Sequence, residues 1–465
     1  MKPRFLLRDK NSQRKTVFSK TSLSIIHYQL FLEMSLRFLF IDFNAFFASV
    51  EQQENPHLRG KPVVVLPVMA ENTACIAASY EAKKFGIKTG TSAKEARLKC
   101  PELIVLEARP PLYVRYHHQL IEAVESCIPV YLVKSIDEMA CELSGSQTKK
   151  ENAVALAKKI KQTIADRCGE FMRASVGIAP NIFLAKTASD MQKPNGLIVI
   201  EEQDLPEILY PLELQDLTGI GRNMVKRLYR NGIYTVEQLC SAEKEKLRSV
   251  WGGIEGDRMY ERLRGIEPPL APVHHTTIGH SHMLTPKERN TTGAVAVMHR
   301  MLQKAAMRLR DMKYRTKTMY AGIRYYNDQQ WSDEITFTET SDTLQLTLAL
   351  TKMLERKPHF NETPLQVSVT LLNLTPEEEH TPSMFDNEER STALNAAVDE
   401  LNLRFGKTAL YFGEAHSALE SSPARIAFNH IPDIEIEDGK GGRPKKKKKK
   451  PEISLPEGMD ETDPL

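Results

Sequence analysis

The chain has 465 residues, of which 41% are hydrophobic and 26% are charged, and its formal net charge is only +3. This composition is typical of a globular protein with two to four domains, so attraction to a polyanion must come from local clusters of charge. The six cysteines form no C-x-x-C pair, and no apolar run reaches the roughly 18 residues of a membrane helix. We therefore expect no zinc site, no disulfide framework, no membrane span and a cytoplasmic location.

The first segment, residues 1–33, contains seven Lys or Arg against two acids and shows no sustained periodicity. Because such a segment has no face that it could bury, we predict a disordered basic arm. An ordered region is expected from about Met34, with a buried strand that begins at Phe38.

Strands and helices alternate in the next part of the chain. "KPVVVLP" (61–67) predicts a short strand, and "ASYEAKKFG" predicts a helix that ends at Gly86. From Ile128, "VYLV" and "KSIDEMACEL" predict two strands, and the apolar spacing from Asn152 predicts a helix. Two paired strands followed by a helix indicate an α+β sheet domain.

After Ile200 the pattern becomes short, helical and punctuated by glycine, which predicts a separate small α domain. The proline-containing stretch 265–277 is the best candidate for a linker. A further domain follows, with a helix at 293–312, a strand at "TMYAGIRYY", a helix at 344–354 and a strand from Leu365. After about Glu377 we expect irregular structure that ends in the disordered lysine run 445–450.

Three carboxylates stand at strand ends. Asp42 follows the apolar run from Phe38, and Asp137 and Glu138 stand side by side at the start of "DEMACEL". Adjacent acids that enter an apolar sheet are costly unless a positive charge compensates them, and Mg²⁺ prefers a few carboxylates together with substrate phosphates. Three acids on two strands suit a two-metal phosphoryl transfer. The alternative is a turn residue at Asp42 and a solvated strand edge at the other two.

Four motifs follow one another along the chain: "DFNAFFASVE", "ASYEAKKFGIKTG", "SIDEMACEL" and "VGIAPNIFLAKTASDMQKPNG". In this order and spacing they resemble the Y-family translesion DNA polymerases of the DinB/UmuC type, over most of residues 34–376. The resemblance implies an α+β multidomain fold shaped like a right hand. It has a ferredoxin-like palm, small fingers, a helical helix-hairpin-helix thumb and an α/β little finger.

The resemblance also implies domain boundaries. After the arm at 1–33, with Met34 as the natural start, we expect the palm at 34–45 and 111–200 and the fingers at 46–110. The remaining parts are the thumb at 201–266, the linker at 267–276, the little finger at 277–376 and the C-terminal tail at 377–465.

By the same resemblance, two Mg²⁺ ions are held by the three acids Asp42, Asp137 and Glu138, with the backbone carbonyl of Phe43 as a further ligand. The nucleotide site is implied to contain a steric gate against the ribose 2′-hydroxyl, Phe47, and its neighbour Phe46, although both rings could equally be core residues. The implied contacts to the triphosphate are Tyr80, Lys83 and Lys193. Family members of the DinB type usually have Arg at the position of Lys83, so the choice between DinB and UmuC stays open.

The motif "LTGIGRNMVKRL" is a helix-hairpin-helix signature, in which Gly219, Gly221 and Lys226 are expected to hold the DNA backbone. Basic residues of the little finger are expected to add a salt-sensitive hold on the duplex or, alternatively, to form a solvated helix face: Lys304, Arg308, Arg310, Lys313, Arg315 and Lys317. In "HTPSMFD", the residues Ser383, Met384 and Phe385 fit a sliding-clamp peptide or an ordinary apolar anchor.

The resemblance implies a template-directed DNA polymerase that performs translesion synthesis as a monomer, with primer-template DNA, dNTP and a sliding clamp as partners. One alternative is a non-catalytic DNA-binding adaptor of the same family, and the intact acids argue against it. Another is a nucleotidyl cyclase on a palm-like sheet. A cyclase has no duplex to grip, so the helix-hairpin-helix argues against that.

Overall fold

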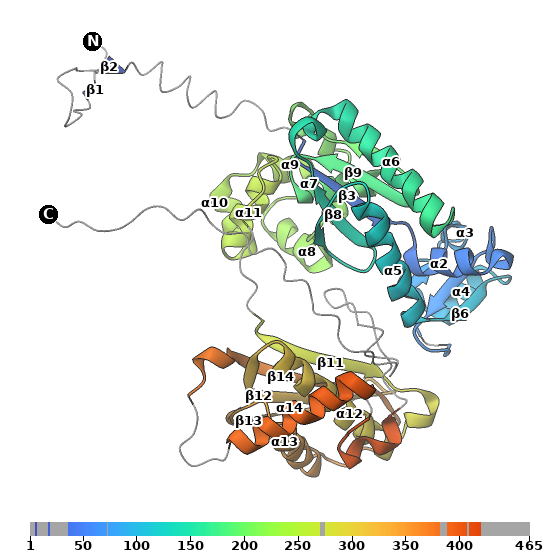
Figure 1. Ribbon diagram of the computed structural model, residues 1–465, viewed down its shortest axis with the longest axis vertical. Helices are drawn as coiled ribbons and strands as arrows, with labels where there is room; N and C mark the ends of the chain where they lie inside the picture. The colour runs from blue at the N-terminus through green and yellow to red at the C-terminus, as the bar shows by residue number, and fades with distance from the viewer. Residues whose placement is uncertain are drawn as a thin grey trace. The chain divides into compact units, whose positions relative to one another are not determined.

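The computed structural model describes residues 5–6, 17–18, 36–71, 73–269, 275–381, 388–406 and 409–419. Within these ranges, no helix is both long enough and apolar enough to cross a membrane. The chain divides into two compact units, Met1–Pro272 with Ile426–Ile431 and Val273–Arg425 with Pro432–Leu465 (Figure 1). The predicted linker at 267–276 spans this division, and residues 270–274 lie outside the described ranges.

Of the predicted basic arm, only Phe5–Leu6 (β1) and Val17–Phe18 (β2) are described, and they pair as antiparallel strands. At these four positions the structure differs from the predicted disorder. A two-residue strand is too short to leave a periodic pattern in the sequence.

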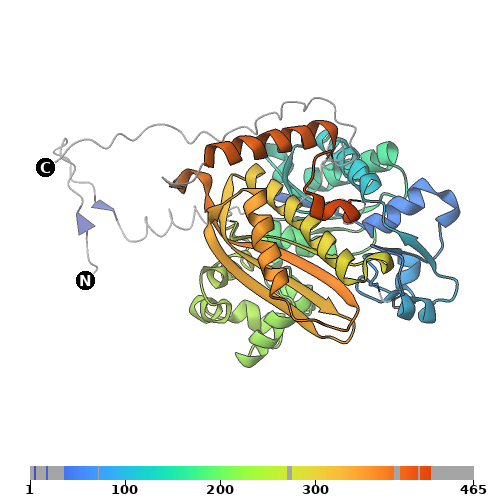
Figure 2. The same ribbon diagram turned by 90° about the horizontal axis from the view of Figure 1, so that it is seen from below.

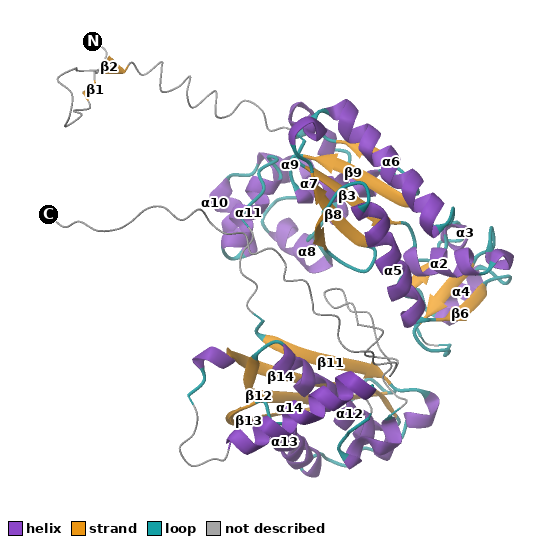
Figure 3. Ribbon diagram, viewed as in Figure 1, coloured by secondary structure: helices purple, strands orange, loops and turns teal. Residues whose placement is uncertain are grey.

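A five-stranded sheet forms the centre of unit 1, in the order β10-β9-β3-β8-β7. All residues of its middle strand β3 are buried, which explains the unbroken apolar run that precedes Asp42. Helices α5 and α6 pack on this sheet, and α7 contacts β3 and β9 (Figure 3). The bounds are β3 (Phe38–Phe43), α5 (Pro110–Glu125), β7 (Val130–Val133), β8 (Glu138–Glu142), α6 (Lys150–Cys168), β9 (Ala174–Ala179), α7 (Ile182–Met191) and β10 (Leu197–Val199).

The alternation of side chains along β3 decides where Asp42 points. Phe38 and Phe40 belong to the core that also contains the buried residues of α7. Because side chains two residues apart share a face, Asp42 points to the same face as these two rings. Its cross-strand partner on β8 is Glu138, so both carboxylates lie on the α7 face of the sheet.

A smaller three-stranded sheet, in the order β5-β4-β6, has its own core around Val64 and Leu66. The elements of this part are α2 (Phe46–Glu54), β4 (Val63–Leu66), β5 (Ala77–Ala78), α3 (Tyr80–Lys83), α4 (Ala93–Lys99) and β6 (Ile104–Glu107). Helix α2 begins directly after the end of β3, with Ala45 at its N-cap. The paired rings Phe46 and Phe47 therefore start a helix at the carboxylate end of the strand.

The predicted small α domain consists of α8 (Arg222–Arg230), α9 (Val236–Ser241), α10 (Lys244–Trp251) and α11 (Ile254–Arg262). Its buried residues, including Leu228 and Leu247, share one continuous hydrophobic core with α7 and with Phe38 of the sheet. The helical region is thus packed onto the sheet through α7.

Unit 2 contains an antiparallel four-stranded sheet in the order β11-β14-β12-β13. Helices α12 and α13 pack against each other and share a core with the sheet (Figure 2). Helix α12, strand β12, helix α13 and strand β14 agree with the helix, strand, helix, strand pattern of the sequence, whereas β11 and β13 were not predicted. Their bounds are β11 (Thr277–Met283), α12 (Thr291–Asp311), β12 (Tyr314–Tyr325), β13 (Gln330–Thr340), α13 (Thr343–Glu355) and β14 (Pro364–Pro376).

The expectation of irregular structure after Glu377 is wrong, because residues Glu388–Phe405 form the 18-residue helix α14. Polar contacts hold this helix to the unit: Asn395 Nδ2 donates to Asp342 at 2.8 Å, and Arg310 Nη2 donates to Asp399 Oδ1 at 2.8 Å. A helix attached mainly through polar side chains lacks the apolar stripe by which helices are recognised in a sequence.

The same contacts change the interpretation of the basic residues in this unit. Arg310 is paired with Asp399, Arg315 with Glu388 at 3.0 Å, and Lys317 with Glu339 at 3.2 Å. These three side chains make ion pairs within unit 2, and the expectation that they also hold the duplex stays a prediction.

Candidate active site

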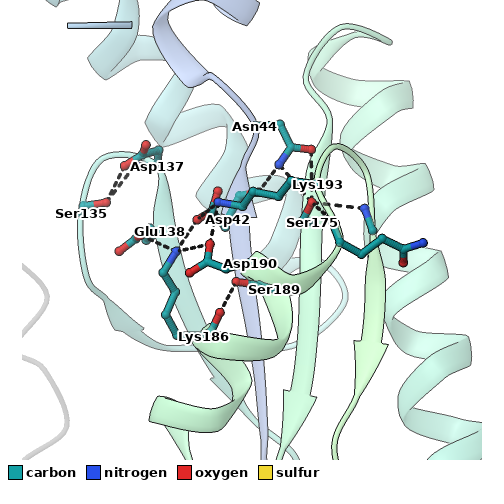
Figure 4. Close-up of polar contacts among 12 residues, drawn as sticks. Asp42, Asn44, Ser135, Asp137, Glu138, Ser175, Lys186, Ser189, Asp190 and Lys193 are labelled. Atoms are coloured by element: carbon teal, nitrogen blue, oxygen red, sulfur yellow. Dashed lines mark hydrogen bonds and ion pairs between the residues drawn. The ribbon is translucent and has the colours of Figure 1, made fainter. Parts of the chain in front are cut away.

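The three predicted carboxylates come together at one end of the five-stranded sheet (Figure 4). Asp42 lies opposite Glu138 in the β3–β8 ladder. Asp137 immediately precedes β8, and its backbone carbonyl accepts a hydrogen bond of 2.9 Å from the amide of Phe43. Backbone pairing therefore fixes the relative positions of all three residues.

Two lysines from α7 and the loop after it bind Asp42, Glu138 and a further acid, Asp190. Lys186 Nζ contacts Glu138 at 2.8 Å and Asp190 at 3.0 Å, and it also pairs with Asp42. Lys193 Nζ contacts Asp42 at 2.7 Å and Asp190 at 2.8 Å. Burial alone would lower the pKa of Lys186, but the charges of Asp42, Asp190 and Glu138 together raise it.

Asp137 has a different environment from the other two predicted ligands. Its carboxylate accepts a hydrogen bond of 2.6 Å from the Ser135 hydroxyl. Burial, followed by the charges of Asp42 and Glu138, raises the pKa of Asp137 to about 6, although the Ser135 bond opposes the shift. A carboxyl group that is costly to ionise in this place would be stabilised in its charged form by a nearby cation.

The donor set fits a hard divalent cation. Of the four carboxylates, those of Asp42, Glu138 and Asp190 contact only two lysines between them, and that of Asp137 is bonded to Ser135. Carboxylate oxygens with this excess of negative charge are the ligands that Mg²⁺ prefers. In the described part of the chain, no three acidic, histidine or cysteine side chains converge as ready metal ligands, since Asp137 turns to Ser135 while Lys186 bridges Asp42 and Glu138.

The paired rings have unequal exposure. Phe46 is buried, with 3% of its surface exposed, between Phe43 and Phe47 at centroid distances of 6.3 and 5.7 Å. Phe47 is half-buried and stacks on Tyr113 of α5, with ring centroids 4.4 Å apart and planes inclined by 18°. Phe46 is therefore surrounded by packing contacts, whereas Phe47 keeps part of its ring accessible.

The ring under Phe47 is itself anchored. The Tyr113 hydroxyl donates a hydrogen bond of 2.7 Å to Glu51 of α2, and Arg109 pairs with the same carboxylate. Burial raises the pKa of Tyr113 above its usual range. The phenol therefore stays protonated and keeps its hydrogen bond to Glu51.

Tyr80 and Lys83, the predicted contacts to the triphosphate, both interact electrostatically with Asp42. The Lys83 ammonium lies over the Tyr80 ring, 4.2 Å from its centroid. Burial, together with the charges of Asp42 and Asp190, raises the pKa of Tyr80 to about 12. Burial and the neighbouring charge of Lys193 lower the pKa of Lys83. The three residues predicted to contact phosphate thus interact electrostatically with one another or with Asp42.

The predicted helix-hairpin-helix has the backbone that the motif requires. Gly219 has a φ of 88°, in the left-handed region that favours glycine. Gly221 is the N-cap of α8, where the first amides of the helix have no partner within the helix. Lys226 is exposed on the same helix. The candidate clamp residues Ser383, Met384 and Phe385 lie outside the described residues.

Sequence reasoning missed several members of the site: Lys186, Asp190, Tyr113 and Glu51. For Lys186 and Asp190 a signal is present, because with Lys193 they recur at helical spacing in and after the buried segment "IFLAKTASDM". Charged residues on one side of an otherwise buried helix need a partner of opposite charge. Tyr113 and Glu51 carry no comparable signal, since they meet only in the folded chain.

Comparison with known proteins identifies the family. The chain matches the impB/mucB/samB family model over residues 41–190, the C-terminal domain of that family over 275–384 and a SAM-like helix-hairpin-helix tandem over 211–264. It is 32% identical over 381 residues to the DNA polymerase IV of Moorella thermoacetica, with 80% of this chain and 94% of that protein covered.

Two further similarities agree. DNA polymerase IV 1 of Bacillus subtilis strain 168 is 29% identical over 406 residues, with 84% of this chain and 95% of that protein covered. A solved Y-family DNA polymerase chimera has a TM-score of 0.61 and 25% identity, and the match covers 73% of this chain and 100% of that chain. The predicted family, fold class and enzymatic activity are therefore confirmed, and the chain belongs to the Y family of DNA polymerases, which carry out DNA-directed DNA synthesis in lesion bypass.

Proposed function

We propose that this polymerase extends a primer 3′-hydroxyl by nucleotidyl transfer from dNTP, with two Mg²⁺ ions held by Asp42, Asp137, Glu138 and the Phe43 carbonyl. The observation that carries the proposal is the β3–β8 register, which places Asp42 opposite Glu138 and joins the Asp137 backbone to Phe43. When bound, the ions would activate the hydroxyl and stabilise the attacking and leaving oxygens at phosphorus.

The chain's own residues orient the nucleotide. We assign Tyr80, Lys83 and Lys193 to the triphosphate, where fixed positive charge favours the charge that develops during transfer. The interactions of Lys83 with Lys193 and Asp42 support this assignment, because they place both ammonium groups beside the carboxylates. A polyanionic ligand would reduce the repulsion between these two ammonium groups.

Phe47 is proposed as the steric gate that excludes a ribose 2′-hydroxyl. Its half-exposed ring is supported from behind by the stacked ring of Tyr113, which Glu51 anchors. Because Tyr113 supports it, the Phe47 ring cannot easily move aside to make room for a ribose 2′-hydroxyl. The burial of Phe46 supports a role as a packing neighbour of the gate rather than as a second nucleotide contact.

Primer-template DNA is the proposed macromolecular partner, bound through its backbone by the α8 amides near Gly219 and Gly221 and by exposed Lys226. This contact would be independent of sequence and sensitive to salt.

Replacement of Asp137 tests the metal assignment. We expect Asp137→Ala to lower primer extension with Mg²⁺ by at least about 1,000-fold, which corresponds to several kcal/mol of barrier. Extension is measured on undamaged and abasic templates, and duplex binding is measured separately and should persist. Glu151→Ala, an exposed acid in the first turn of α6, is the control. Normal extension by Asp137→Ala would show that the ligand assignment is wrong.

Replacement of Phe47 tests the gate. For Phe47→Ala we expect ribonucleotide incorporation relative to dNTP to rise roughly 100-fold, with dNTP use retained. Single-nucleotide insertion with paired dNTP and rNTP measures this ratio. Unchanged sugar selectivity would mean that Phe47 is only a packing residue.

A further inference from the structure

The loop after α7, residues 192–196, carries Lys193 and is attached to the sheet by two buried polar side chains, Asn44 and Ser175. Asn44 follows β3 directly, two residues after Asp42, and is 2% exposed. Ser175 lies on β9 next to Asp42 in the ladder and is fully buried. Figure 4 shows both side chains between the carboxylates and this loop.

The contacts of Asn44 and Ser175 are directed at the loop backbone. The Asn195 amide donates to Asn44 Oδ1 at 2.7 Å, and the Gly196 amide donates to Ser175 Oγ at 3.2 Å. The Ser175 hydroxyl donates to the carbonyl of Gln192 at 3.1 Å. Asn44 Nδ2 in turn donates to Ser175 Oγ at 3.1 Å. Both ends of the loop are therefore bound to one connected pair.

The loop has little freedom to move away from this pair. A Cβ atom at Gly196 would lie 1.9 Å from the carbonyl oxygen of Gln192, so the backbone turns back closely on itself. Lys161 of α6 donates to the carbonyls of Asn195 and Gly196 at 2.6 and 3.1 Å. The Lys193 side chain extends from this loop, and its Nζ lies 2.7 Å from the Asp42 carboxylate.

From this geometry we infer that Asn44 and Ser175 are positioning residues, which fix the Lys193 ammonium relative to Asp42 through the backbone of residues 192–196. A displacement of about 1 Å in a group that acts on the reacting phosphate can cost on the order of 100-fold in rate. The inference rests on the proposed role of Lys193 at the triphosphate. It adds that this role depends on two neutral side chains that touch no substrate.

A double-mutant cycle tests the dependence. Asn44→Ala is expected to lower the efficiency of single-nucleotide insertion by about 10- to 100-fold, as measured in the full-length protein with Mg²⁺ and primer-template DNA. In the Lys193→Ala background the same change should cost less than about 3-fold, because residues that act as a unit are non-additive. Ser175→Ala should behave in the same way. Multiplicative losses would overturn the inference.

Asn181→Ala is the matched control. Asn181 is equally buried, and its amide also binds backbone, but its hydrogen bonds join the carbonyls of Arg262 and Ile266 at 2.8 and 3.0 Å and the amide of Leu184 at 2.7 Å rather than residues 192–196. We expect it to lower thermal stability while its effect on insertion, if any, multiplies with that of Lys193→Ala. If Asn181→Ala were as non-additive with Lys193→Ala as Asn44→Ala is, Asn44 would have only a general role in folding. This result would contradict the inference.

Hydrogen exchange provides a readout that does not depend on activity. In Asn44→Ala, the peptide that contains residues 192–196 should exchange faster, because the Asn195 amide loses its acceptor, whereas Asn181→Ala should leave this peptide protected. Unchanged exchange in Asn44→Ala would overturn the positioning role. If exchange rises but Lys193→Ala does not affect insertion, the triphosphate contact of Lys193 fails and the positioning of the loop stands.

Discussion

Two clusters of charged residues, one in each unit, differ in their balance. At the end of the palm sheet, three carboxylates share two lysines, and Lys186 alone contacts all three of these acids, while the neighbouring Asp137 is bonded to Ser135 instead. In unit 2, Arg310 and Arg315 each contact a single carboxylate, that of Asp399 and that of Glu388.

This difference distinguishes a cation-binding site from ion pairs that only hold two elements of the fold together. A balanced pair with good geometry compensates its own desolvation and can fasten one element to another, as Arg310 fastens α14. Where carboxylates outnumber their positive partners, the remaining negative charge is not compensated within the protein. Such a cluster contributes little to the stability of the fold and favours the binding of a cation.

The largest effect is expected for Lys186→Met. The change leaves Asp42 and Glu138 without their shared partner in a largely buried place, which should cost about 3–5 kcal/mol of stability in Mg²⁺-free buffer. Millimolar Mg²⁺ should restore part of the loss, because a divalent cation replaces the missing charge. Denaturant unfolding with and without Mg²⁺ measures both effects.

Lys158→Met, on the exposed side of α6, is the control for Lys186→Met and should change stability little. A small effect of Lys186→Met that is insensitive to Mg²⁺ would mean that the palm cluster is an ordinary ion-pair network.

A smaller effect is expected for Arg310→Met in unit 2. It removes two hydrogen bonds to Asp399, of 2.6 and 2.8 Å, and leaves that acid unpaired at a mostly buried position. We expect a loss of about 2–3 kcal/mol, at the lower end for buried pairs because neither side chain is fully enclosed. The double variant Arg310→Met/Asp399→Leu should recover most of it, since an apolar pair can replace a balanced ion pair.

Thermal unfolding and primer extension of the unit 2 variants report stability and activity separately. Extension by the double variant should stay near the wild-type level. If the double variant is no more stable than Arg310→Met, the pair has a role beyond fastening α14.

A third effect, similar in size to that of Arg310→Met, concerns pH and the buried His117, whose Nδ1 lies 2.7 Å from the carbonyl of Ile136, next to Asp137. Burial lowers the pKa of His117 to about 4 from 6.5. Because the unfolded chain takes up the proton near pH 6.5 and the folded one does not, this residue's stabilising contribution is present above pH 6.5. It is lost as pH falls towards 4, by up to about 3 kcal/mol.

His117→Asn keeps a donor for the Ile136 carbonyl and cannot titrate. Its unfolding free energy should therefore depend less on pH between 6.5 and 4 than that of the wild type. The exposed neighbour provides the control, since His118→Asn should keep the wild-type dependence. Asp137 contributes a slope of the opposite sign in this window because its pKa is raised, and comparison at equal pH cancels it. Parallel curves for wild type and His117→Asn would contradict the prediction.

Much of the fold and the centre of the site could be predicted from the sequence. The apolar run before Asp42 predicted a buried strand, and β3 is buried throughout. The glycines around Gly219 predicted the turn before α8. Such features are local, because a buried strand, an amphipathic helix or a left-handed turn leaves its own residue pattern within a few positions.

The tertiary structure alone decided three other features: helix α14, the lysine bridge at Asp42 and the Asn44–Ser175 pair that holds the loop of Lys193. Each depends on polar side chains far apart in the chain, such as Asn44 and Asn195 or Arg310 and Asp399. A single hydrogen bond between distant residues leaves no periodic pattern in the sequence and requires no particular residue types beside either partner. Burial against a core repeats along an element and can be read from the sequence, whereas partners for polar groups are chosen only once the chain has folded.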